Sequence, residues 1–202
     1  FVQPTANFLP SVGAYLFLPL RFTSEFPFIG MTPIAFREWG YYELMAGGLF
    51  ATCPLLLLAL AAPFLRRRMH RSGYWGLATC SLALAVLLAV FDSHTAGLGW
   101  RYICDFGWMM AIAALAPMLY LMHPDGDAIV ASAPDPSERN EPRRDVTKRH
   151  PMVLACVRGL VVAALMASII LAVLACFIPG RDDSLINNNP VLYDTVVAWF
   201  RL

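Results

Sequence analysis

The chain has 202 residues, of which 58% are hydrophobic and only 14% carry a charge. An ordinary soluble domain carries roughly 25% charged residues, so this composition favours a protein embedded in a membrane. The net charge of +1 offers no bulk electrostatic attraction for nucleic acid, and we expect no nucleic acid among the partners.

The first 43 residues are apolar but are interrupted by prolines at positions 4, 10, 19, 27 and 33. Proline removes a backbone N–H and restricts the residue before it, so this segment cannot form one straight helix. For residues 1–43 we predict a loop with short helices, lying on or dipping into the outer face of the membrane. The alternative is the tail of a truncated span.

Four apolar runs follow that are long enough to cross a bilayer, for which about 20 residues are needed. Three of them, over 44–65, 73–91 and 100–122, make up a unit over residues 44–122, and the fourth covers 152–178. The fold class is therefore all-α: a polytopic transmembrane bundle of about four spanning helices with additional interfacial helices.

The span over 44–65 has two features of its own. Gly47 and Gly48 lack side chains and permit another helix to approach closely near one end. Pro54 lies inside the span, and we expect it to kink the helix.

Positive charge predicts the orientation of such a bundle, because short loops rich in Lys and Arg remain on the cytoplasmic side. Residues 66–72 and 123–151 hold nine of the fifteen Lys and Arg residues. We therefore place these two loops in the cytoplasm and both ends outside, in a multi-pass protein of the cell (plasma) membrane. Residues 123–151 are also too polar and proline-rich to bury a core, which predicts a disordered loop.

Residues 179–202 form the outer-face tail of the chain. Asn189 is placed to cap a helix that begins at Pro190. Leu192, Val196 and Trp199 then recur at helical spacing, which predicts a short amphipathic helix lying in the membrane interface.

A polar cluster opens the span over 100–122. Arg101 and Asp105 are four residues apart and would share one face of a helix, with Tyr102 beside them. Ionisable groups at membrane depth are costly and usually face a bundle interior or a watery cavity. In the functional interpretation, Arg101 holds an anionic lipid headgroup or phosphate and Asp105 orients it. In the structural interpretation, the two residues form an ion pair near the headgroups.

A second polar site at the outer rim is formed by Asp92 and His94, which close the second span. Two such residues at i and i+2 are too few to define a metal site, and the alternative is a pair of interfacial loop residues. The sequence assigns no catalytic residue, no metal ligand and no cofactor within the chain.

The Arg101-Tyr102 pair, followed by a long apolar helix to Pro117, resembles a late span of GT-C-type membrane glycosyltransferases. The overall layout also resembles unassigned bacterial multi-pass membrane proteins of this kind, through the Phe26-Pro27-Phe28 loop, the Arg101-Tyr102/Asp105-Phe106 span and the Asn189-Pro190/Tyr193 helix. The resemblance implies transfer of a sugar from a polyprenyl-phosphate donor at the outer face, with Arg101 in contact with the lipid phosphate.

The chain begins at Phe1 rather than Met, and we interpret it as the C-terminal part of a longer protein. The resemblance then implies that the catalytic carboxylates, and any divalent metal that they bind, lie upstream of Phe1. The partners expected for this part are membrane lipid and a polyprenyl-phosphate sugar.

Two other classes of function stay open, and with them the question whether the protein is an enzyme. One is half of a transporter or flippase, a class that commonly shows internal repeats and broken helices, although we find no repeat here. The other is a non-catalytic structural membrane subunit whose loop over 125–148 binds a partner.

Overall fold

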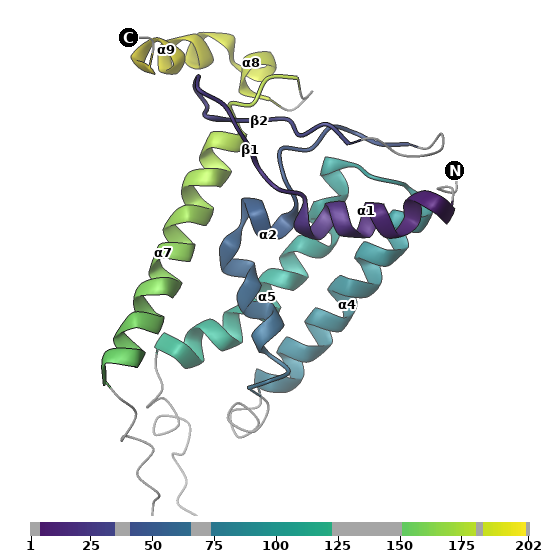
Figure 1. The fold of residues 1–202 in the computed structure, drawn as a ribbon, viewed down its shortest axis with the longest axis vertical. Helices are drawn as coiled ribbons and strands as arrows, with labels where there is room; N and C mark the ends of the chain where they lie inside the picture. Colours follow the sequence, from purple (N-terminus) through teal and green to yellow (C-terminus); the bar gives the residue numbers. More distant parts are fainter. Residues whose placement is uncertain (1–4, 35–40, 66–73, 123–150, 181–183, 201–202) are drawn as a thin grey trace, which may run out of the picture.

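The computed structural model describes residues 5–34, 41–65, 74–122, 151–180 and 184–200. These residues are mostly helical, and the strands among them are two pieces of two residues each. The all-α class predicted from the sequence is therefore correct. Figure 1 shows long helices forming a bundle, with shorter elements gathered at one end of it.

Three helices are long and apolar enough to cross a membrane: α4 (Tyr74–Thr95), α5 (Ile103–Met122) and α7 (Pro151–Ala175). A 3₁₀ turn, η3 (Trp100–Tyr102), precedes α5 and extends its apolar segment. At 1.5 Å per residue, 22 residues reach about 33 Å, which covers the hydrocarbon core. Much of their apolar surface is exposed in the chain alone, as lipid-facing helices require.

The prediction of four spans is not confirmed, because the segment expected over 44–65 is broken. It consists of a four-residue helix, α2 (Leu49–Thr52), and a 3₁₀ helix, η1 (Pro54–Ala61), which meet at Cys53. Pro54 has no N–H to donate to the preceding turn and its ring crowds that turn. The result is a change of helix type at the first residue of η1, rather than the expected kink in a continuous helix.

A side chain of another helix accepts a hydrogen bond from a backbone N–H at this break. The backbone N–H of Leu55 donates to the hydroxyl of Ser168 in α7 over 3.1 Å, and that hydroxyl donates to the carbonyl of Ala164. Backbone groups in a bilayer have no water to bond, so a neighbouring Ser or Thr commonly takes over where proline interrupts a helix. This bond also fixes α7 against η1 at the level of the break.

We expect Ser168→Ala to lower the free energy of unfolding by about 1 kcal/mol, since it leaves the Leu55 N–H without an acceptor. The change is measured by denaturant titration of the purified chain in lipid bicelles. Thr79→Val is the matched control, because the Thr79 hydroxyl bonds only carbonyls of its own helix. Equal losses in the two variants would show that the interhelical bond contributes nothing.

At one end of the bundle, α1 (Thr5–Phe17) lies across α4 and α5 (Figure 1). The helix continues through Pro10, whose side chain is exposed. A small hairpin follows, in which β1 (Arg21–Phe22) pairs antiparallel with β2 (Ile29–Gly30).

Gly48 lets α2 begin directly against the end of α1, as expected for a close approach. Its N–H donates to the carbonyl of Leu18 over 2.8 Å. A Cβ at this position would lie 2.6 Å from the backbone nitrogen of Leu18 and 2.7 Å from the carbonyl oxygen of Ala14. Both atoms belong to backbone that is held by its own hydrogen bonds, so neither side can yield without breaking one.

Gly48→Ala should therefore destabilise the chain by about 2–3 kcal/mol through overpacking. Gly76→Ala is the control, since a Cβ at this helical position meets nothing within 4 Å and alanine favours the helix. Unfolding of both variants in bicelles tests the contact. A Gly48→Ala chain as stable as the wild type would mean that α1 does not lie where the structure places it.

The C-terminal tail folds back over the hairpin. It contains α8 (Leu185–Asn188) and α9 (Pro190–Phe200), and the Asn189 side chain accepts a hydrogen bond from the Leu192 N–H over 3.1 Å, which confirms the predicted cap. Phe26 stacks on Phe200 of α9 with centroids 4.5 Å apart and also contacts Phe177 beyond α7. Three segments distant in sequence are thus joined by aromatic rings.

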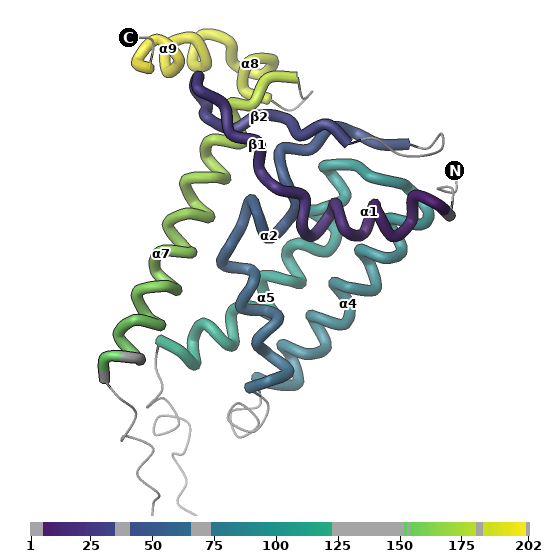
Figure 2. The backbone as a smooth tube through the Cα atoms, viewed as in Figure 1, coloured from purple at the N-terminus to yellow at the C-terminus, as the bar shows by residue number. Residues whose placement is uncertain are grey.

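Both described ends of the chain lie at the same end of the bundle, on opposite sides of it. Figure 2 shows that α1 and α9 are at one end of the bundle, while the starts of α4 and α7 are at the other. This arrangement is compatible with the predicted topology. The loop over 66–72 lies outside the described residues, as does all of 123–151 except Pro151, so their placement in the cytoplasm stays a prediction.

Candidate functional site

The predicted lipid-phosphate residues lie at the same end of the bundle as α1 and the hairpin. Arg101 and Tyr102 belong to η3, and Asp105 is in the first turn of α5. The side chains of Arg101 and Asp105 are exposed, and the guanidinium of Arg101 lies 5.4 Å from the centroid of the Tyr102 ring. The structure therefore presents the exposed cation of Arg101 against an aromatic ring at this end of the bundle.

The ion pair of Arg101 is formed with Glu43 and not with Asp105. Its Nη2 lies 3.7 Å from a carboxylate oxygen of Glu43, and among the described residues this is the ion pair that the structure contains. The reason is local: residues 100–102 form a 3₁₀ turn with three residues per turn, so the i, i+4 alignment of an α-helix does not hold there.

Glu43 makes most of the polar contacts around Arg101, a role that was not predicted from its position on the outer side of the chain. Its carboxylate accepts hydrogen bonds from the hydroxyl of Tyr41 and from the backbone N–H of Trp100, the latter over 3.2 Å. Arg101 also donates to the Tyr41 hydroxyl over 3.3 Å. The hydrogen bond to Glu43 raises the pKa of Tyr41, so this phenol stays protonated and keeps donating at neutral pH.

Backbone pairing places this segment against the turn before α5. The N–H of Glu43 donates to the carbonyl of Leu98 over 2.7 Å, and the N–H of Leu98 donates to the carbonyl of Tyr41. Such pairing depends on backbone geometry and has no sequence motif. Sequence reasoning therefore missed Glu43 and Tyr41 as partners of Arg101.

The structure does not bring Asp92 and His94 together. Asp92 is buried with 7% of its surface exposed, whereas His94 is exposed and its ring contacts Phe8 of α1 at 5.9 Å. Residues at i and i+2 lie about 200° apart around a helix, so the two side chains leave α4 in different directions. A joint role for them stays a prediction, without support from this geometry.

The Tyr15 side chain of α1 bonds the backbone of the turn between α4 and α5, at Gly97 and Gly99. Its buried hydroxyl donates to the carbonyl of Gly97 over 2.8 Å and accepts from the N–H of Gly99 over 2.9 Å. Burial raises the pKa of this phenol far above its ordinary value. The rim residues that follow, including Arg101, are thus held in position by α1.

We expect Tyr15→Phe to lower the free energy of unfolding by about 2 kcal/mol, because two buried backbone groups lose their partner. Since the pKa of Tyr15 is raised on folding, its stabilisation is present below about pH 10 and lost as pH rises further. The decrease in the free energy of unfolding above about pH 10 should therefore be smaller in Tyr15→Phe than in the wild type. Unfolding titrations across pH measure both effects, with Tyr120→Phe as the control.

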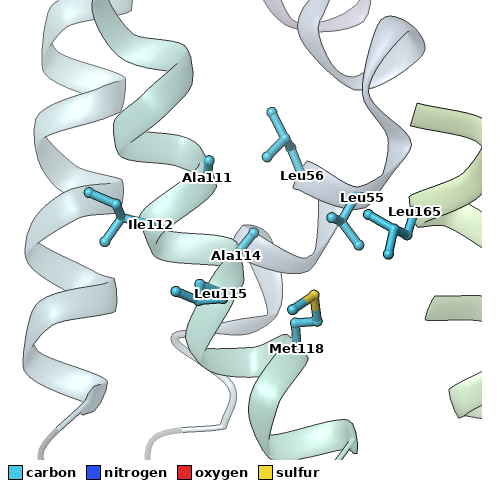
Figure 3. A pocket seen from close by; sticks show the side chains of 8 residues that line it. All are labelled: Leu55, Leu56, Ala111, Ile112, Ala114, Leu115, Met118 and Leu165. Atoms are coloured by element: carbon cyan, nitrogen blue, oxygen red, sulfur yellow. The ribbon is translucent and has the colours of Figure 1, made fainter. Parts of the chain in front are cut away.

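An apolar groove lies deeper in the bundle, between η1, α5 and α7 (Figure 3). Its volume is about 360 Å³, and its lining is almost wholly hydrocarbon: Leu55, Leu56, Ala111, Ile112, Ala114, Leu115, Met118 and Leu165. In Figure 3, Met118 of α5, Leu55 of η1 and Leu165 of α7 surround the same space. A groove of this chemistry suits a hydrocarbon chain and offers nothing to a polar ligand.

One exposed face of α5 connects the rim to this groove. Asp105, Trp108, Ala111 and Leu115 follow one another at intervals of three or four residues, and all are exposed. Arg101 lies one turn before them. At 1.5 Å per residue, Ala111 is about 15 Å below Arg101 along the helix, a distance that a lipid chain easily covers.

The acidic, His and Cys side chains of the described residues are dispersed. Among them, no group of three or more His, Cys, Asp or Glu side chains comes close enough to hold a metal ion. Any divalent metal implied by the resemblance to GT-C enzymes would need ligands from elsewhere.

Comparison of the chain with protein-family models, with curated proteins and with solved structures found no match. The function must therefore be argued from the site itself.

Proposed function

We propose that the chain is the membrane-embedded C-terminal part of an outward-facing glycosyltransferase that uses a polyprenyl-phosphate-linked sugar. In this proposal Arg101 contacts the phosphate, and the apolar groove takes part of the polyprenyl chain. The observations that support it are the exposed cation of Arg101 in the turn before α5, and an exposed face of α5 that runs from Asp105 to an almost wholly apolar groove.

The Arg101–Glu43 pair does not oppose this role. The side chain of Arg101 is 69% exposed and that of Glu43 is 35% exposed, and ion pairs at such exposure contribute little to stability. A phosphate presents several acceptor oxygens to a guanidinium in paired geometry. Glu43 and Tyr41 then position Arg101 until the phosphate arrives.

The chain would supply binding and electrostatic stabilisation of the leaving phosphate, and the space for the lipid tail. A carboxylate to deprotonate the acceptor hydroxyl is also needed. The proposal assigns that group, with any metal, to residues upstream of Phe1.

Binding of a polyprenyl phosphate to the purified chain in nanodiscs, followed by native mass spectrometry, tests the proposal. Arg101→Ala should weaken binding of the phosphate about tenfold, because a charge-assisted hydrogen bond is lost. It should leave binding of the uncharged polyprenol unchanged. Arg21→Ala, which removes an exposed arginine of the hairpin, is the matched control.

Ala111→Phe should weaken binding of both the phosphate and the alcohol, since the ring fills the groove without entering the core. Ala83→Phe places the same ring on the exposed side of α4 and should have no effect. If Arg101→Ala matches Arg21→Ala and Ala111→Phe matches Ala83→Phe, the proposal is wrong.

Half of a transporter or flippase is the second candidate, favoured by the break between α2 and η1. Discontinuous helices are typical of transporter binding sites. Movement of a fluorescent polyprenyl phosphate across liposomes that contain the chain would favour this class over the transferase. A structural subunit would instead lose its function when residues 125–148 are deleted.

A further inference from the structure

A buried polar face of α1 covers the end of α4. Asn7, Ser11 and Tyr15 are spaced four residues apart, so they form one stripe along the helix, and each is at most 1% exposed. The two ends of this stripe are located by contacts: Phe8 meets the ring of His94, and the Tyr15 hydroxyl bonds the carbonyl of Gly97. Ser11 lies between these contacts, over the last turns of α4.

Asp92 lies on the α4 side of this interface. Its side chain is 7% exposed, and its Oδ2 is buried without a hydrogen-bond partner. The Ser11 hydroxyl is also fully buried and has no partner. Ser93 beside Asp92 donates to the carbonyl of Ala89 over 2.7 Å, which leaves the lone pairs of its oxygen free to accept or coordinate.

The charge of Asp92 is not balanced by the described protein groups. No Lys, Arg or His side chain among them forms an ion pair with it, since the described ion pair belongs to Arg101 and Glu43. His94 leaves the same helix on another side, toward Phe8. The groups near this interface are the phenol of Tyr15 from α1, Asp105 and Tyr102 from the α5 side, and Glu43.

An uncompensated buried carboxylate is costly, and at the edge of a membrane such groups pair, bind ions or carry protons. A single negative charge is balanced by a single positive one. The neutral oxygens of Ser11 and Ser93 are hard ligands, of the kind that alkali and alkaline-earth cations prefer. The described residues offer no cluster of three acidic or His/Cys side chains of the kind that commonly holds a multiply charged ion.

We propose that Asp92, with the hydroxyls of Ser11 and Ser93, binds a small monovalent cation, and that α1 covers the bound ion. Sodium would be coordinated by the three side-chain oxygens together, whereas a proton would bind the carboxylate and the resulting O–H would donate to a serine oxygen; the experiment separates the two. The proposal does not rest on the lipid-phosphate proposal, because its ligands are Asp92, Ser11 and Ser93 rather than Arg101.

The thermal midpoint of the purified full chain in nanodiscs tests the site. Choline chloride is replaced by sodium chloride at constant ionic strength and neutral pH, and choline is too large for the interface. A bound sodium ion should raise Tm by about 5 °C at saturating concentrations. If sodium has no effect, lowering the pH in choline should raise Tm instead, which identifies the proton as the cation.

Asp92→Asn should remove the cation response in either arm. Its Tm in choline at neutral pH should equal or exceed that of the wild type, since the unbalanced charge is gone. Asp194→Asn, which removes an exposed carboxylate from α9, is the matched control and should retain the response. Ser11→Ala keeps the carboxylate but loses one ligand, so it should respond only at several-fold higher cation concentration.

The proposal is overturned if neither cation changes the Tm of the wild-type chain. It is also overturned if Asp92→Asn or Ser11→Ala responds like the Asp194→Asn control. The wild-type chain and the Ser11→Ala variant test the proposal by themselves, so the test does not depend on whether Asp92→Asn folds.

Discussion

The absence of water in a bilayer imposes the constraint on which this structure depends: every backbone polar group at that depth needs a partner within the protein. Three helices meet this requirement by themselves. The segment over 44–65 does not, because Pro54 interrupts it, and the Leu55 N–H is bonded by Ser168 instead. That bond positions α7 beside η1, and the apolar groove lies where η1, α7 and α5 meet.

The same requirement explains the structure of the turn between α4 and α5, which contains Arg101. Chain that turns between helices exposes N–H and C=O groups, and at this end of the bundle the Tyr15 hydroxyl, the Glu43 carboxylate and the backbone of residues 41–43 bond them. These partners hold η3 as a short turn before α5. Arg101 points outward as a consequence, so the exposed cation is a product of how the turn is closed.

Hydropathy was sufficient to predict the three long helices, since each apolar run is continuous and ends near charged or turn residues. The helix cap at Asn189 could also be predicted from the sequence, because capping depends on adjacent residues. The break at Cys53 could not be predicted, because proline allows either a kink or a change of helix type. The outcome depends on Ser168, which is 113 residues from Leu55 in the sequence. The partner of Arg101 was missed for the same reason: Glu43 reaches it through tertiary pairing.

The candidate site shows where charge can be tolerated in such a fold. Arg101 remains near water, with Glu43 and Tyr41 around it, and this arrangement costs little. Asp92 is the opposite case, because α1 excludes water from it while the described residues supply no counter-charge. Helix α1 therefore has two effects on one end of the bundle: through Tyr15 it orders the turn that presents a cation, and through its polar stripe it encloses an anion. A change that lifts α1 would alter both at once, which couples the outer rim to the buried carboxylate.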